Sequence, residues 1–144
     1  MSTSFETISA ERAGVARTVM ASSPTFQLGG VSLASWRAKR VRLYIEANLE
    51  HRLDTDILAR VACASRAHFC RCFKRTFGVT VHQYVVQRRI ERAQQLMLTT
   101  QATLTEIAAS CGMSDHSHLT RMFRRAVAES PSAWRKRNLG VTYG

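Results

Sequence analysis

Two arginine-centred stretches hold the side chains best suited to recognition chemistry. The first, His68 to Arg75, has the sequence HFCRCFKR, and the second, His118 to Arg125, has the sequence HLTRMFRR. Arg71 and Arg121 occupy the same place in each stretch. A guanidinium carries a permanent positive charge and a rigid fork of N–H donors, which fits the anionic groups of a polyanion. The two stretches therefore indicate recognition of a polyanion.

Other chemistry has little support in the sequence. The chain offers no phosphate-cradling loop, no cluster of metal ligands and no nucleophile paired with a base, so we expect no catalytic residue, no metal and no cofactor. His116 and His118 would point about 200° apart on a helix, which disfavours a shared metal ion. The cysteines show neither a CxxC motif nor zinc-finger spacing: Cys63, Cys70, Cys72 and Cys111.

The positive charge is concentrated in one part of the chain. The 144 residues include 21 Lys and Arg against 10 Asp and Glu, a formal net charge of +11. Residues 1–35 hold two side chains of each sign, so 19 basic and 8 acidic side chains place the whole excess of +11 in residues 36–144. Such a field attracts polyanions, and nucleic acid is the commonest partner of a compact basic helical domain. Charge alone leaves an anionic membrane surface, or no such partner, as alternatives.

The composition and the apolar runs bear on class and location. The chain is 45% hydrophobic and 22% charged, with two prolines and seven glycines, which is typical of a folded helix-rich protein. Its first residues show no basic segment followed by an apolar one, and no run approaches the ~18 apolar residues of a membrane span. We therefore expect a cytoplasmic protein with no membrane association.

Helical periodicity and capping residues predict about seven helices after a weakly ordered extension. Residues 1–35 show no sustained period and are expected to contain at most one short helix, near 9–20. From Trp36 onward, apolar residues recur at helical spacing, and polar residues that can cap a helix precede each stripe: Asp54, Ser65, Thr80, Thr103 and Ser130. Thr103 and Glu106 form a capping-box motif.

The two halves of the helical region repeat each other. Ser65 matches Ser114 at an offset of 49, and residues further along match at an offset of 50. A short helix, a tight turn and a second helix form a helix-turn-helix unit, whose second helix lies in the major groove. The predicted fold is thus all-α: a first unit at 36–79, a linker helix at 80–100 and a second unit at 101–138. The linker would span about 30 Å, close to the ~34 Å between successive major-groove faces.

These motifs resemble the AraC/XylS family of bacterial transcription regulators over about residues 38–137. The resemblance rests on Ser65 to Gly78, on the linker pattern Arg89-Ile90-x-x-Ala93-x-x-Leu96 and on Ser130-Pro131-x-x-Trp134. It implies a DNA-binding domain of two units that activates transcription at a promoter by contacting RNA polymerase. No small-molecule effector domain is evident, so the chain resembles the stand-alone members. A monomer could place both units on double-stranded promoter DNA.

Three departures from the family pattern affect the first turn and predict a looser second unit. Cys63 stands in the first turn where the family usually has glycine, so the turn forms without the permissive residue. Met113 stands where an aromatic residue is common, and Ala128-Glu129 where a glycine usually follows the recognition helix.

The resemblance assigns candidate DNA contacts to the two recognition helices. The expected base-facing residues are Ala67, Cys70 and Arg71 in the first unit, and His116, Ser117, Thr120 and Arg121 in the second. The candidate phosphate contacts, which position without specifying, are Arg40, Arg66, Lys74, Arg75, Arg88, Arg124, Arg125, Arg135, Lys136 and Arg137. Arg89 has two interpretations, packing in the linker or an internal ion pair.

Rival interpretations remain open from the sequence. A degenerate family member could act as a protein-interaction module on another regulator or on RNA polymerase. A basic protein could also bind DNA without regard to sequence. Cys70, next to Arg71, could be a reactive thiol whose oxidation blocks DNA binding, although a small neutral side chain is the simpler interpretation.

Overall fold

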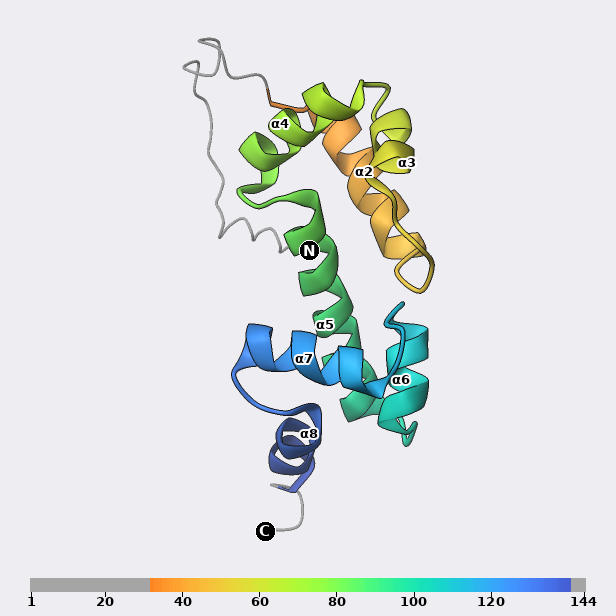
Figure 1. Ribbon diagram of the computed structural model, residues 1–144, viewed down its shortest axis with the longest axis vertical. Helices are drawn as coiled ribbons and strands as arrows, with labels where there is room; N and C mark the ends of the chain where they lie inside the picture. Colours follow the sequence, from red (N-terminus) through yellow and green to blue (C-terminus); the bar gives the residue numbers. More distant parts are fainter. Residues whose placement is uncertain (1–31, 141–144) are drawn as a thin grey trace.

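Seven α-helices and no strand make up residues 32–140, the part of the chain that the computed structural model describes (Figure 1). The helices are α2 (Ser35–Ala47), α3 (Thr55–Val61), α4 (Arg66–Phe77), α5 (Val81–Thr99), α6 (Leu104–Ser110), α7 (His116–Val127) and α8 (Pro131–Gly140). The all-α prediction is confirmed for this part. The helix expected near 9–20 lies outside the described residues. None of α2 to α8 has both the length and the apolar character needed to cross a bilayer.

Capping side chains begin the helices where the sequence places them. Asp54 and Ser65 each accept a hydrogen bond from a backbone N–H of the first turn of α3 and α4. Thr103 and Glu106 form the predicted capping box. Thr80 forms a second one with Gln83, which the sequence analysis did not single out. Each cap pairs a backbone N–H that would otherwise lack a partner within its helix.

The cap of α7 is shifted by one residue from the expected repeat. Asp115, rather than Ser114, accepts the hydrogen bond from the backbone N–H of His118 at 2.8 Å. Ser65 and Asp115 are therefore equivalent at the offset of 50. The extra residue of the second turn lies before the cap.

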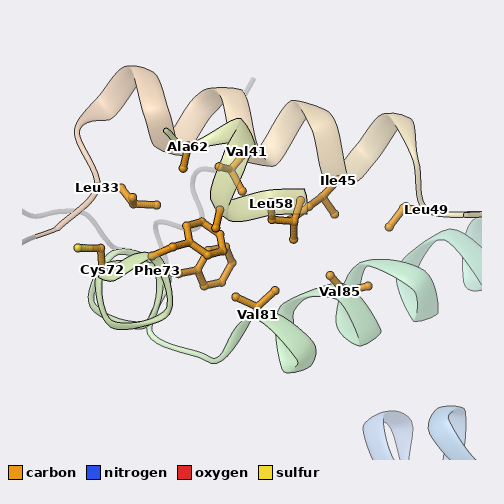
Figure 2. Packing of buried hydrophobic residues seen from close by; sticks show 12 residues of the cluster. Leu33, Val41, Ile45, Leu49, Leu58, Ala62, Cys72, Phe73, Val81 and Val85 are labelled. Atoms are coloured by element: carbon orange, nitrogen blue, oxygen red, sulfur yellow. The ribbon is translucent and has the colours of Figure 1, made fainter. Parts of the chain in front are cut away.

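Two separate hydrophobic cores share one helix. In the first core, Phe69 and Phe73 of α4 are fully buried against α2, α3 and the first half of α5 (Figure 2). In the second core, Leu119 and Phe123 of α7 are fully buried against α6, α8 and the second half of α5. Leu33, which precedes the boundary expected at 36, is also part of the first core. The 19 residues of α5 span about 28 Å and carry both units.

Figure 1 shows the two units at opposite ends of α5. In this view α4 lies above the upper end of α5, α7 crosses the lower half of α5, and α3 and α6 lie to the right of α5. The loop after α2 and the turn before α7 face each other beside α5. The helices α4 and α7 therefore lie at separate places along the molecule.

Two residues other than glycine adopt the left-handed conformation at turns. Cys63 has a φ of 55° in the turn of the first unit, and Ala128 has a φ of 65° at the C-terminal end of α7. At the equivalent places in the other unit stand Gly112 and Gly78, with φ values of 74° and 79°. An L-residue in this region carries a cost of about 1–2 kcal/mol that glycine does not. At both places the absence of glycine therefore leaves a residue with a Cβ atom in a conformation that glycine would adopt without strain.

Ala128→Gly is expected to raise the free energy of unfolding by about 1 kcal/mol, because glycine adopts the left-handed cap without strain. Urea denaturation followed by circular dichroism measures this. Ala126→Gly is the matched control, since Ala126 is exposed within α7 itself. There, glycine should lower stability by about 1 kcal/mol. Two changes of the same sign would contradict the assignment of strain to Ala128.

Candidate nucleic-acid interface

One face of α4 presents the predicted base-contacting residues of the first unit. Because Phe69 and Phe73 hold the opposite face in the core, Ala67, Cys70 and Arg71 are exposed, as sequence reasoning expected. Lys74 continues the same face, at the i+7 position from Ala67. The face offers small side chains near its start and cations toward its end.

The corresponding face of α7 is more polar. His116, Ser117 and Arg121 are exposed, and Arg124 follows at the i+7 position from Ser117. Thr120 is half-buried, and its hydroxyl donates a hydrogen bond to the carbonyl oxygen of His116 at 2.9 Å. This internal bond uses the donor of Thr120, so the side chain retains acceptor capacity and its methyl group for contacts outside the protein.

The same aromatic contact seats each recognition helix on the rest of its unit. The rings of Phe73 and Tyr84 meet edge to face with centroids 5.5 Å apart, and those of Phe123 and Trp134 do so at 5.8 Å. Both pairs are related by the offset of 50. Burial raises the pKa of Tyr84 to about 12, so the ring stays neutral. The equivalent aromatic contacts therefore hold α4 and α7 at equivalent positions in their two units.

Six of the ten candidate phosphate contacts are exposed cations without an ion pair in the described part of the chain. They are Arg40, Lys74, Arg75, Arg124, Arg125 and Lys136. Two others form exposed ion pairs: Arg66 with Asp56 and Arg137 with Glu129, each at 2.9 Å. Exposed pairs of this kind are weak and can exchange for phosphate.

The remaining two candidates, Arg88 and Arg135, are engaged within the fold. Arg88 donates to both carboxylate oxygens of Glu46, at 2.6 and 3.1 Å, and also contacts Glu91. Arg135 donates to the backbone carbonyl oxygens of Ala102 and Thr100, at 2.6 and 2.8 Å. Sequence reasoning could not anticipate Glu46, Thr100 and Ala102 as partners, because they lie 33 to 42 residues away along the chain. We leave both arginines out of the contacts proposed below.

The cysteines divide into two exposed and two buried thiols. Cys63 and Cys70 are exposed, whereas Cys72 and Cys111 are buried. Cys70 and Cys72 therefore lie on opposite faces of α4, as the buried stripe predicted. Burial raises the pKa of Cys111 to about 11, which keeps it a thiol. No group of three or more potential metal ligands forms among residues 32–140.

Comparison with protein families and curated proteins gives consistent matches. A family model described as a helix-turn-helix domain matches residues 58–137. The probable transcriptional regulator LumQ of Photobacterium leiognathi is 35% identical over 91 residues, which cover 63% of this chain and 37% of LumQ. The transposon Tn10 TetD protein of Escherichia coli is 34% identical over 101 residues, covering 70% of this chain and 73% of TetD. The chain spans about a third of the length of LumQ and of the regulator ArgR of Pseudomonas aeruginosa.

Solved structures match the same region. The DNA-binding domain of the global transcriptional factor AdpA, solved in complex with a target DNA, superposes with a TM-score of 0.68 and 31% identity. The match covers 72% of this chain and 93% of that one. A regulator with an AraC-type DNA-binding domain from Chromobacterium violaceum gives a TM-score of 0.66 and 29% identity, over 70% of this chain and 90% of that one.

Proposed function

The chain belongs to the AraC family of helix-turn-helix transcription regulators, and from this we propose that it recognises a specific promoter sequence by inserting α4 and α7 into adjacent major-groove segments. The observation that carries the proposal is the pair of equivalent exposed helix faces, each opposite a fully buried Phe or Leu stripe. The AdpA domain, which has the same fold, was solved in complex with its target DNA.

The two recognition faces differ, so the proposed site is asymmetric. Arg71 and Arg121 each suit a bidentate contact with a guanine. Ala67 and Cys70 are small and suit a thymine methyl group or an intervening water molecule. Ser117 and His116 add hydrogen-bonding groups in the second unit. One chain with two unlike faces can recognise an asymmetric site without a second subunit.

We propose that the protein acts as a monomeric, non-enzymatic activator that contacts RNA polymerase at the promoter. Its relatives are described as transcriptional regulators, and NphR of Rhodococcus is described as a transcriptional activator. Transcription in vitro with purified polymerase, from a promoter containing the selected site, tests this part separately from DNA binding. Binding without a rise in transcript would overturn the activator role, and a fall in transcript would indicate a repressor.

Selection from a random duplex library, followed by titration of the fluorescent selected duplex against nonspecific competitor, tests sequence recognition. A specific regulator should prefer its site by at least about 10³-fold. Equal affinity for all duplexes would indicate a nonspecific DNA binder, and no binding would favour a protein-interaction module. Either result would end the proposal of sequence-specific recognition.

The logarithm of the binding constant is expected to fall with the logarithm of salt concentration with a slope near −5. Six phosphate contacts, each contributing about 0.9, account for this value. Lys74→Ala should make the slope shallower by about 1. The control Lys39→Ala, on α2 and outside the proposed contacts, should leave it unchanged. A slope near −7 would mean that Arg66 and Arg137 exchange their ion pairs for phosphate, and one near −9 that the internally engaged Arg88 and Arg135 contact DNA as well.

A further inference from the structure

One side chain of the linker helix holds the loop of the first unit. Arg89 lies midway along α5, between the two cores. Its Nε donates to the carbonyl oxygen of Leu49 at 3.0 Å, and its Nη2 donates to the carbonyl oxygen of His51 at 2.8 Å. Both carbonyls belong to the loop between α2 and α3. The interaction is thus a pair of hydrogen bonds to backbone, not the internal ion pair considered from the sequence.

The turn of the second unit closes over the same guanidinium. A Cβ atom at Gly112 would lie 2.8 Å from the Nη2 atom of Arg89 and would overlap the carbonyl oxygen of Leu49. Gly112 also has a φ of 74°, a conformation that favours glycine. Only glycine, therefore, allows the turn between α6 and α7 to approach the first unit this closely. Figure 1 shows the two segments facing each other.

Little else joins the two units across this junction. In the part of the chain that the structure describes, the first core has no member from α6, α7 or α8, and the second has none from α2, α3 or α4. Beside Arg89 the units are separated by an open groove, lined from both sides by residues that include Glu50, Arg52, Met113 and His118. The orientation of one unit against the other thus depends on α5 and on the contacts around Arg89.

We propose that Arg89, Gly112 and the carbonyl groups of Leu49 and His51 form a clasp that fixes the orientation of α4 relative to α7. Arg89 is then a positioning residue: it contacts no DNA, yet it determines which spacing between two half-sites both recognition helices can occupy. The part of this inference that concerns the spacing between half-sites on DNA rests on the proposed function. The orientation itself is a property of the free protein and can be measured without DNA.

Arg89 can fix the orientation because it forms two hydrogen bonds, to two different carbonyl groups of the same loop. A single hydrogen bond allows rotation about its axis, whereas two bonds from one planar guanidinium to two carbonyls of one loop restrict the loop in position and angle. Lysine at position 89 could not reproduce this fork. Removing the side chain leaves both cores intact, because Arg89 belongs to neither, and allows each unit to shift its packing on α5.

Double electron–electron resonance, which measures the distance between two nitroxide labels, tests the clasp in the free protein. One label is placed on native Cys63 in the first unit and the other on Ser132→Cys in α8, both exposed, in a Cys70→Ser background. The starting protein should give one narrow distance distribution. Arg89→Ala should broaden it, while circular dichroism shows unchanged helix content. Arg92→Ala removes the same charge from the same helix, and as control should leave the distribution narrow.

Gly112→Ala provides a second test, because it keeps Arg89 but forces the turn away from Leu49. It should shift the mean distance between the labels. Unchanged distributions in Gly112→Ala and in a folded Arg89→Ala would overturn the clasp. If Arg89→Ala failed to fold, an unchanged distribution in Gly112→Ala would overturn it alone.

Binding to duplexes with different spacing between the half-sites tests the positioning role of Arg89. Two base pairs inserted between the half-sites of the selected duplex should weaken binding of the starting protein on the order of tenfold, since both helices no longer dock together. Arg89→Ala should lose less affinity on the same insertion. An equal loss in both proteins would overturn the positioning role. If neither protein prefers any duplex, the proposed function fails, whereas the clasp is still decided by the label distances.

Discussion

Phe123→Ala is expected to lower the free energy of unfolding by about 3–5 kcal/mol. Phe123 is fully buried in the second core and meets Trp134 edge to face. Its removal deletes a large apolar surface and leaves a cavity in the second core. A change of this size is a large part of the ~5–15 kcal/mol that stabilises a domain. Urea denaturation followed by circular dichroism measures the loss.

Phe123→Leu is the matched control, because it keeps most of the apolar volume and should cost much less. Amide hydrogen exchange shows which helices lose stability. Since the cores are separate, amide protection in Phe123→Ala should fall more in α6, α7 and α8 than in α2, α3 and α4. An equal fall throughout would show that the two units unfold as one. A loss below about 1 kcal/mol would contradict the packing described for Phe123.

Features set by neighbouring residues could be predicted well from the sequence. A cap depends on a polar side chain and backbone N–H groups two or three residues later, so Asp54, Thr80 and Thr103 were identified correctly. The buried stripe of α4 depends on helical spacing alone, and it separates Cys72 from Cys70 as expected. The repeat located the second unit because the first provides a template.

The partners of the internally engaged arginines could not be predicted in this way. Arg88, Arg89 and Arg135 all lie in basic stretches and look alike in the sequence. Apart from Glu91, three residues after Arg88, their partners are 33 to 42 residues away and are brought near only by packing; Glu46 and the carbonyl group of Leu49 are examples. Backbone carbonyls, moreover, have no signature in the sequence. A basic residue is therefore a candidate for phosphate binding until its internal partners are known.

At two turns the sequence shows that glycine is missing, but it does not show which backbone conformation the turn then adopts. Cys63 and Ala128 stand where glycine is usual, and both adopt the left-handed conformation that the turns require. Both turns therefore keep the left-handed conformation, and each costs conformational free energy that glycine would not. Gly112 could not be exchanged in the same manner, because a Cβ atom there would overlap another backbone segment.

Arg71→Ala is expected to weaken binding to the selected duplex by about 5- to 150-fold, which corresponds to the ~1–3 kcal/mol of one bidentate contact with guanine. Because Arg71 is exposed opposite Phe73, the substitution should leave folding stability within about 0.5 kcal/mol of its starting value. Arg121→Ala should act in the same way at a different base pair. Competition among duplexes that vary one base pair at a time measures both effects.

Two further variants separate base recognition from attraction by charge. Arg71→Lys keeps the positive charge but loses the planar fork, so it should lose preference at one base pair while the salt slope stays near that of the starting protein. Arg75→Ala should instead weaken all duplexes alike and make the slope shallower by about 1, because a phosphate contact carries no sequence information. If Arg71→Ala behaves like Arg75→Ala, Arg71 binds phosphate, and the sequence preference of the first unit must come from Ala67 and Cys70 or from the shape of the DNA.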